Sequence, residues 1–502
     1  MKTIRRTSNI GELMIILGTN SIKDTGFDVD NSLRFNNGSS DRLTRTTTGS
    51  VTNADKVTFS AWIKRSAQIN QNISFWGEYY DTNNRTEIGL NSTNDHFYIY
   101  GKDGGSTYVQ VETNASFRDV SAWYHFVLAY DSTDGTAANR VKMYVNGVQI
   151  TSFATATYPN QNTDIRLNST NQGYSVGDAE SADHFWDGYM CEVAHIDGQQ
   201  LAADQFGEFD SDSGIWKPID ISGLTFGTNG YYLQFKQSGV GTNASGMGAD
   251  TSGNDNHFAV NNLTAVDQSS DTCTNNSSNI NALSIGSGVT LSEGNLQVLM
   301  DASAQFGGHS TIGVSTGKWY CEIKYSARTD ADRLMLGISG NPNLLAYASP
   351  FGSGAGYVGG AQEPTSYGYY SDGGNSFNND NSSSYGASYT VGDIIGIALD
   401  LDNNKLYFSK NGTFQNSGDP TSGSTGTGAI SIGAASGTNT GNYFFAVSES
   451  SGSYGHTTQC NFGSPPYAIS SGNTDGNGYG NFEYAVPSGY YALNTKNLAE
   501  YG

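Results

Sequence analysis

Two Asn-Gly dipeptides constrain the fold of this chain more than any other feature of its sequence. The first, Asn146-Gly147, joins the alternating segments Val141–Val145 and Val148–Ile150. The second, Asn411-Gly412, follows the alternating segment Lys405–Ser409. An Asn-Gly pair beside such segments is the strongest short-range signal of a β-hairpin, because both turn residues need positive φ. The sequence therefore predicts one tight hairpin in each half of the chain.

Short alternations of apolar and polar residues recur along the chain and predict that it is all-β. Residues 123–130 are more continuously apolar, which is typical of a central strand covered on both faces. Only 14% of the residues are charged, against a usual share of about 25%, and 12% are aromatic. Abundant turn formers and aromatics favour strands over helices, and the aromatic content argues against disorder. The other expected strands are residues 57–63, 97–100, 108–111, 188–196, 294–298, 317–323, 334–338 and 393–401, with one helical stretch near 201–206.

The length of 502 residues favours two domains, because one hydrophobic core rarely organises so long a chain. We expect an N-terminal tail at 1–24, a first β-sandwich at 25–235 and a second at 286–502. Residues 236–285 are rich in Gly, Asn and Ser and are expected to form a partly ordered connecting segment. A Tyr-rich stretch at 347–389 is expected to form large loops at one end of the second sandwich.

The charge and the cysteines exclude several classes of function. A net charge of −22 disfavours binding to bare nucleic acid or to an anionic membrane surface. None of the four cysteines has a metal-ligand spacing, so buried free thiols are predicted, with an oxidised pair left open. These cysteines are Cys191, Cys273, Cys321 and Cys460.

The N-terminal tail holds a short apolar run at Leu13, Ile15, Ile16 and Leu17. It is far shorter than the roughly 20 residues that a membrane span needs, and no small-residue cleavage pattern follows it. We therefore expect these four side chains to dock the tail on another protein, without membrane insertion.

The first half resembles the laminin-G/concanavalin-A-like lectin superfamily. The residues that carry the resemblance are Thr58–Lys64, Trp123–Val127, Val141–Gly147 and Asp187–Ala194, in that order. The resemblance implies a jelly-roll sandwich of two antiparallel sheets.

The second half resembles a SPRY domain, which is another concanavalin-like sandwich. The matching residues are Gly317–Glu322, Val391–Asp400, Leu406–Gly412, Asn461–Gly463 and Pro487–Asn494.

The tandem as a whole, with Ser32–Phe35 and Thr251–Asn256, is similar to large structural proteins of tailed bacteriophages, especially marine ones. That likeness implies a non-catalytic virion protein, a tail or head fibre subunit that displays lectin-like domains for host adhesion. Its partners would be other virion proteins, reached through the tail, and a receptor that is a host-surface glycan or protein. Family analogy suggests a homotrimer. A capsid decoration protein and a carbohydrate-active enzyme remain as alternatives.

Catalytic patterns are weak. Retaining glycosidases need two carboxyl groups about 5 Å apart, supplied in one concanavalin-like branch by Glu-x-Asp-x-x-Glu. The nearest pattern, Glu208-Phe-Asp210-Ser-Asp212-Ser213, has Ser213 in place of the second Glu. His125 lies in an apolar run and is expected to pack rather than act as a base. No catalytic residue is predicted.

Two sets of residues are candidate binding sites. Asp131 and Asp134 share a loop and carry the oxygen ligands that Ca²⁺ prefers, although Asp is also a good turn residue. No other cofactor is expected. Tyrosines of the 347–389 stretch offer amphipathic contact area for protein or glycan recognition, with packing on the sandwich as an equal alternative. The candidates are Tyr357, Tyr367, Tyr369, Tyr370 and Tyr385.

Overall fold

The computed structural model describes residues 22–66, 72–168, 173–179, 184–286, 288–301, 307–345 and 356–502. It confirms the all-β prediction, because almost every regular element in this part of the chain is a strand. The exceptions are the short helix α1 (Thr495–Tyr501) and single 3₁₀ turns. These turns are Asn37–Ser39, Ala137–Asn139, Arg166–Asn168, Ala203–Gln205, Ala265–Asp267, Pro342–Leu345, Gln415–Ser417, Pro420–Thr425 and Ala435–Gly437.

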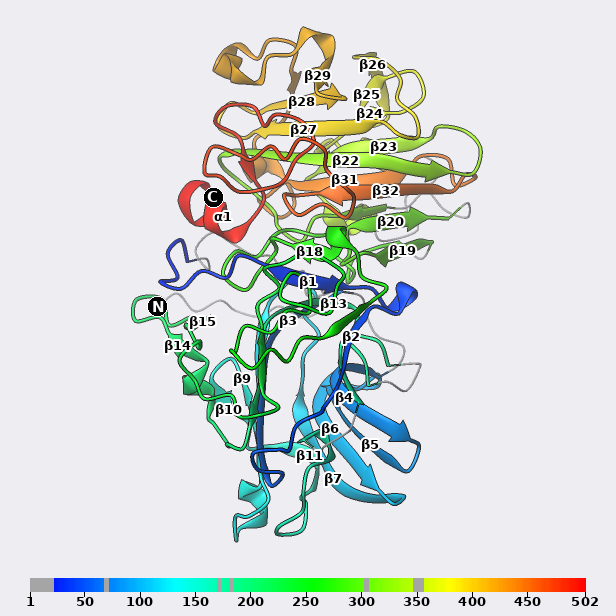
Figure 1. The fold of residues 1–502 in the computed structure, drawn as a ribbon. Coiled ribbons are helices and arrows are strands. Elements are labelled where there is room, and N and C mark those ends of the chain that lie inside the picture. Colours follow the sequence, from blue (N-terminus) through cyan, green and yellow to red (C-terminus); the bar gives the residue numbers. More distant parts are fainter. Residues whose placement is uncertain are drawn as a thin grey trace.

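The first half is a sandwich of two antiparallel sheets (Figure 1). Sheet 1 has the order β10-β9-β8-β3-β13-β1-β18, with β16 also paired to β13, and sheet 2 has the order β11-β7-β6-β5-β4-β12-β2-β17. The strands of sheet 1 are β1 (Ser32–Phe35), β3 (Lys56–Arg65), β8 (Tyr124–Asp131), β9 (Val141–Val145), β10 (Val148–Gln149), β13 (Gly188–Asp197), β16 (Tyr231–Leu233) and β18 (Gln268–Ser269). Those of sheet 2 are β2 (Arg42–Thr46), β4 (Ile73–Asp81), β5 (Asn84–Leu90), β6 (His96–Asp103), β7 (Ser106–Ser116), β11 (Phe153–Thr157), β12 (Gly173–Val176) and β17 (Ala259–Asn261). A small hairpin, β14 (Gly207–Phe209) with β15 (Trp216–Pro218), stands apart.

The second half is built in the same way. Sheet 3 has the order β19-β20-β32-β22-β27-β28-β29, with β30 on β28 and β33 parallel to β22, and sheet 4 has the order β21-β31-β23-β24-β25-β26. The strands of sheet 3 are β19 (Val289–Ser292), β20 (Gln297–Met300), β22 (Lys318–Arg328), β27 (Ile394–Asp400), β28 (Lys405–Lys410), β29 (Thr413–Phe414), β30 (Ile430–Ser431), β32 (His456–Asn461) and β33 (Tyr491–Ala492). Those of sheet 4 are β21 (Gly307–His309), β23 (Leu334–Ser339), β24 (Ser366–Tyr370), β25 (Asn375–Asn378), β26 (Asn381–Ser384) and β31 (Phe444–Glu449).

Both predicted Asn-Gly hairpins form, and their local contacts are the same. Asn146 and Asn411 have φ of 48° and 47°, and the glycine after each has φ of 78° or 79°. The side-chain oxygen of Asn146 accepts from the backbone N–H of His125 at 2.8 Å, and that of Asn411 accepts from Ile394 at 2.9 Å. In each hairpin the Asn side chain therefore ties the turn to the start of the neighbouring strand, which is β8 in the first sandwich and β27 in the second.

Each sandwich encloses one large apolar core, and further apolar clusters cover several outer sheet faces. Phe126 and Leu128 of β8 point into the first core, whereas Val127 and Ala129 pack outward against residues 201–232. This double covering confirms the prediction for residues 123–130. On the second sandwich, residues 482–492 cover sheet 3, and Tyr357 with Val358 covers sheet 4.

Two stretches that read as irregular in the sequence carry strands. Residues 347–389, expected as large loops, include β24, β25 and β26, which extend sheet 4 as a meander. Residues 236–285 contribute β17 to the edge of sheet 2 and β18 to the edge of sheet 1. The helical stretch expected near 201–206 is a 3₁₀ turn at Ala203–Gln205. In the part of the chain that the structure describes, no helix is long and apolar enough to span a membrane.

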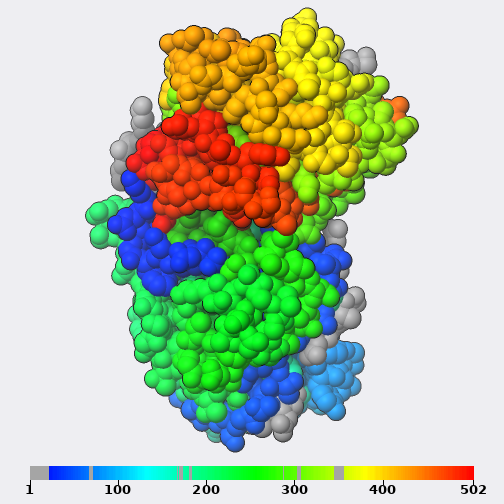
Figure 2. Space-filling model, turned by 45° about the horizontal axis from the view of Figure 1, so that its top comes forward, coloured from blue at the N-terminus to red at the C-terminus, as the bar shows by residue number. Residues whose placement is uncertain are grey.

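Buried polar contacts tie the first sandwich to the segment that connects it to the second. Lys64 of β3 donates to Asp271 Oδ2 at 2.8 Å, to Asn276 Oδ1 at 2.7 Å and to the Ser277 carbonyl at 2.8 Å. Both members of the Lys64–Asp271 pair are almost fully buried. Figure 2 shows the C-terminal segment, in red, next to the N-terminal segment, in blue. The ion pair between Lys496 and Asp28, at 2.6 Å, joins these two segments.

Candidate functional site

The outer face of sheet 2 brings tyrosines and carboxylates together. Across β5 and β6, Glu87 lies opposite Tyr100, and across β6 and β7, Tyr98 lies opposite Glu112. Side chains alternate between the two faces of a strand, so these four share one face. The intervening Ile99 points into the core.

These side chains line a hollow of about 250 Å³, which we call the outer-face cleft. It is lined by Asn72, Arg85, Glu87, Asn91, Tyr98, Tyr100, Gln110, Glu112 and His184. Amides, carboxylates and a guanidinium present both donors and acceptors beside two aromatic rings.

Hydrogen bonds hold the acidic groups of the cleft in place. The Nδ1 atom of His184 lies 2.8 Å from Glu87 Oε2, and that of His96 lies 2.9 Å from Glu112 Oε1. A carboxylate only accepts, so each histidine donates through Nδ1. Asn91 also donates to Glu112. Both carboxylates are thus oriented without a ligand.

The tyrosines of the cleft are equally constrained. The ring of Tyr100 is half-buried, with the charged groups of Arg85 and Lys102 at 5.4 Å and 5.9 Å from its centre. Burial raises the pKa of Tyr98 well above its ordinary value, so its hydroxyl keeps its proton. Preorganised rings and planar polar groups suit a polyhydroxylated ligand, because such a ligand stacks on rings and exchanges many hydrogen bonds.

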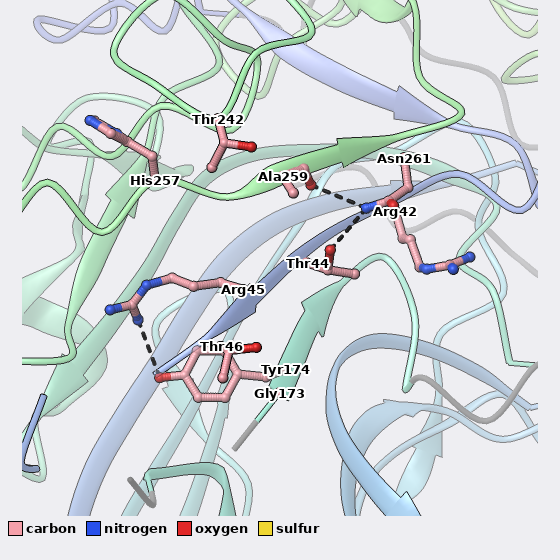
Figure 3. Close-up of a pocket in the computed structure, with 10 residues that line it drawn as sticks. All are labelled: Arg42, Thr44, Arg45, Thr46, Gly173, Tyr174, Thr242, His257, Ala259 and Asn261. Atoms are coloured by element: carbon pink, nitrogen blue, oxygen red, sulfur yellow. Dashed lines mark hydrogen bonds between the residues drawn. The ribbon is translucent and has the colours of Figure 1, made fainter. Parts of the chain in front are cut away.

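A second hollow of about 480 Å³ lies along β2, and we call it the β2–β17 groove (Figure 3). Thr44 accepts a hydrogen bond from the side-chain amide of Asn261 at 2.9 Å, and this pair forms the middle of the groove. The side chains of Arg42 and Arg45 leave β2 on opposite sides. The lining residues are Arg42, Thr44, Arg45, Thr46, Gly173, Tyr174, Thr242, His257, Ala259 and Asn261.

Of the two alternatives for the tyrosines of 347–389, recognition and packing, the structure favours packing for most of the candidates. Tyr367, Tyr369 and Tyr385 are buried in the core of the second sandwich, and Tyr357 is buried against the outer face of sheet 4. Tyr370 is partly exposed and packs on Phe377. Tyr367 and Tyr369 fill the interior because alternate residues of β24 point inward.

The other predicted site residues are placed as follows. Asp131 lies 2.9 Å from Lys56 Nζ and accepts from the Thr133 backbone, while Asp134 accepts from the backbone of Thr136. These contacts are those of turn aspartates. Among the described residues, no group of three or more His, Cys, Asp or Glu is arranged to hold a metal. Leu13, Ile15, Ile16 and Leu17 lie outside the described residues.

One pair in the first sandwich has the spacing of a nucleophile and its base. The Nε2 atom of His125 lies 2.8 Å from Ser60 Oγ, and its Nδ1 accepts from the indole N–H of Trp216 at 3.1 Å. An indole only donates, so Nδ1 is unprotonated and the neutral ring carries its proton on Nε2. A base for Ser60 needs the opposite tautomer. Burial lowers the pKa of His125 to about 3, and the residue packs between Trp62 and Trp216.

The acidic residues of the partial glycosidase pattern, Glu208 and Asp210, make structural contacts. Asp210 accepts from the backbone and side chain of Ser213, which lowers its pKa to about 2. Lys217 lies 3.4 Å from both Asp210 and Glu208. These acids form part of a surface hairpin.

Comparisons with known proteins identify both halves. The family model described as the Concanavalin A-like lectin/glucanases superfamily, of laminin-G type, matches residues 37–204, and that of the SPRY domain matches residues 301–430. The chain carries a laminin-G-like domain and a SPRY domain. The resemblances seen in the sequence are confirmed at this level.

Individual relatives match only in part. A Ran-binding proteins 9/10 homolog of Drosophila melanogaster is 46% identical over 48 residues, which is 9% of this chain and 5% of that protein. The SPRY domain of human HERC1 is 15% identical with a TM-score of 0.27, covering 36% of this chain and 96% of the other. A putative carbohydrate binding protein from Bacteroides ovatus is 16% identical with a TM-score of 0.32, covering 47% of this chain and 60% of the other.

Sequence reasoning missed the outer-face cleft, although one signal was present. Residues 97–100 alternate Phe, Tyr, Ile, Tyr, so one set of rings must face away from the core. What the sequence did not show was that Glu87 and Glu112 flank those outward tyrosines.

Proposed function

We propose that this chain is a non-catalytic recognition protein whose laminin-G-like domain binds glycans in the outer-face cleft. The observation that carries the proposal is the pair of oriented carboxylates, Glu87 and Glu112, beside the rings of Tyr98 and Tyr100 in the outer-face cleft of sheet 2. Such an array suits hydroxyl-rich ligands, and laminin-G-like and SPRY domains are both compatible with binding.

A non-catalytic role is supported by the arrangement of the acid, base and nucleophile candidates. His125 holds the tautomer that donates to Ser60, and Asp210 is occupied by Ser213 and Lys217. Incubation with polysaccharides tests this part of the proposal. Release of reducing ends by the purified chain, lost in a Glu87→Gln or Glu112→Gln variant, would contradict it.

The binding proposal is tested with an array of immobilised oligosaccharides. Tyr100→Ala removes a half-buried ring of the cleft, whereas Tyr80→Ala removes a tyrosine that is 71% exposed at the end of β4 and outside the cleft. We expect Tyr100→Ala to lose the retained glycans and Tyr80→Ala to bind as the native chain does. No retained glycan, or equal retention by both variants, refutes the proposal.

We further propose that the chain acts on the virion of a tailed phage, as a tail or head fibre subunit that contacts the host surface. The support is the likeness of the tandem to such proteins, and repeated display would strengthen weak individual contacts. Deleting residues 1–24 should then abolish incorporation while both domains stay folded. A truncated chain found in purified particles at normal copy number would contradict docking through the tail, and an even distribution over the shell would favour a decoration protein.

A further inference from the structure

A buried lysine, aspartate and asparagine meet where the connecting segment crosses the outer face of sheet 1. The Nζ atom of Lys64 donates to Asp271 Oδ2 at 2.8 Å and to Asn276 Oδ1 at 2.7 Å. The side chain of Lys64 has no exposed surface, that of Asp271 is 2% exposed, and Asn276 is 9% exposed. The carbon of the Asn276 amide is thus one C=O bond beyond an oxygen that the amine already contacts.

Further hydrogen bonds fix how the three groups face one another. The Oδ1 atom of Asp271 accepts from the indole N–H of Trp123 at 3.1 Å, while Oδ2 faces Lys64. The Nδ2 atom of Asn276 donates to the Ser121 carbonyl at 2.7 Å. A carbonyl only accepts, so the amide cannot be turned round, and its oxygen must face the lysine.

Aromatic side chains surround the three groups and limit the access of water. Tyr189 pairs with Lys64 across β13 and β3, and its ring centre lies 5.7 Å from Nζ. Trp62 and Cys191 pack beside Tyr189 in one apolar cluster. Two buried charges carry a desolvation cost, and transfer of a proton from Nζ to Asp271 leaves an uncharged amine and acid instead. A lysine amine in a desolvated pocket is a nucleophile.

A second group of the same residue types lies in the second sandwich and lacks this geometry. Lys410 lies 3.1 Å from Asp393 Oδ2, and Asn411 donates from its side-chain amide to Asp393 Oδ1 at 2.7 Å. The amine donates to the Ser388 carbonyl, and the amide oxygen accepts from a backbone N–H. The lysine is 26% exposed and the aspartate 15%. Of the two groups, the one at Lys64 is buried and joins the amine to the amide oxygen.

We propose that Lys64 and Asn276 form an intramolecular isopeptide bond, with Asp271 as the proton acceptor. The uncharged amine attacks Cγ of Asn276, so that an Nζ–Cγ bond forms and the Cγ–Nδ2 bond breaks. Two protons leave Nζ in the course of the reaction. Asp271 carries one of them to Nδ2, which departs as ammonia, and the other goes to solvent. Nothing is oxidised or reduced, and the 2.7 Å contact makes the reaction unimolecular.

The bond joins the first sandwich to the connecting segment. Its two residues are 212 apart in the sequence. A covalent link between residues so far apart restricts the unfolded chain strongly. Before the bond forms, the hydrogen bonds and the ion pair of Lys64 hold this junction; afterwards it stays joined even when they open.

Peptide mass spectrometry of the purified full-length chain tests the proposal. We expect a tryptic digest to contain a branched peptide that joins Lys64 to Asn276 and is lighter than its two linear parts by one ammonia. Asp271→Asn keeps the shape of the side chain but removes the proton acceptor, so it should lose the branched peptide. Asp393→Asn, which removes the carboxylate paired with Lys410, is the matched control and should keep it.

Three outcomes overturn the inference. The first is a native chain in which the peptides of Lys64 and Asn276 are linear, a result that does not depend on whether any variant folds. The second is a branched peptide that joins Lys64 to Asp271 and is lighter by one water, because the partner would then be the acid. The third is as much branched peptide in Asp271→Asn as in the native chain, since the carboxylate would then have no part in the proton transfer.

Discussion

The two Asn-Gly turns permit a quantitative test, because the same atoms make the same contacts in both domains. We consider Asn146→Ala and Asn411→Ala, each compared with the corresponding Asn→Gly variant. In the native chain both asparagines hold positive φ and accept one backbone N–H of the neighbouring strand. Alanine loses the hydrogen bond and must also adopt the left-handed conformation. Glycine loses only the hydrogen bond.

The expected losses follow from these two contributions. A left-handed conformation costs an L-residue roughly 1–2 kcal/mol, and a hydrogen bond contributes about 1 kcal/mol. Each Asn→Ala variant should therefore lose about 2–3 kcal/mol of unfolding free energy and each Asn→Gly variant about 1 kcal/mol. Because the geometry is shared, the losses at Asn146 and Asn411 should be similar, and since the sites are independent, the double variant should lose their sum to within about 0.5 kcal/mol.

Urea unfolding followed by tryptophan fluorescence measures the laminin-G-like domain, since Trp319 is the only tryptophan of the SPRY domain. Hydrogen exchange of β27 and β28 measures the turn at Asn411. The reasoning is refuted if Asn146→Ala and Asn146→Gly lose the same free energy, because backbone strain would then contribute nothing. A loss at only one of the two sites would show that the hairpins are not equivalent.

Three further predictions concern buried groups. Lys64→Met leaves the buried Asp271 carboxylate without its cation and should lower the free energy of unfolding by urea by about 3–5 kcal/mol, with partial recovery when Asp271→Asn is added. A loss below about 1 kcal/mol would contradict a stabilising role of the Lys64–Asp271 pair. Burial raises the pKa of Glu192 from 4.5 to about 7, so its contribution to stability is present below 4.5 and lost as pH rises through about 7. Glu192→Gln should flatten the stability profile between those pH values, and an unchanged profile would contradict the shift. Of the four thiols, Cys273 is partly exposed and the others are buried, so a thiol reagent should label at most one site in the native protein and all four in urea. Burial raises the pKa of Cys460 to about 12, and rapid labelling of this thiol in the native protein would be inconsistent with the fold.

Sequence reasoning succeeded where the pattern was local. Residues 123–130 and 393–401 have long apolar segments, and both are central strands of their sheets. It failed at 347–389, because β25 and β26, the last two strands of sheet 4, are polar and have no apolar alternation to distinguish them from loops. Residues 236–285 contribute strands of only two or three residues, which are too short to leave a pattern.

The candidate site was harder to predict because it depends on register. The outward direction of Tyr98 and Tyr100 follows from the alternation of β6 alone. Their neighbours Glu87 and Glu112 come from β5 and β7, and a slip of one residue in either pairing would have placed apolar side chains there instead. Pairing of strands that are close in sequence still depends on turn geometry and bulges, such as the irregularity between Gly101 and Lys102.

The side chains that cover the outer faces of the four sheets bear on where the proposed ligand would bind. A sheet has two faces, and a protein either packs chain against the outer one or leaves it to solvent. In the described residues, apolar clusters lie on the outer faces of sheet 1, sheet 3 and sheet 4, formed by residues 201–232, by residues 482–492 and by Tyr357 with Val358. Sheet 2 has no such cluster and instead carries the outer-face cleft and the β2–β17 groove. This face, with tyrosines, carboxylates and arginines where the other sheets carry apolar side chains, is therefore where we place the proposed ligand.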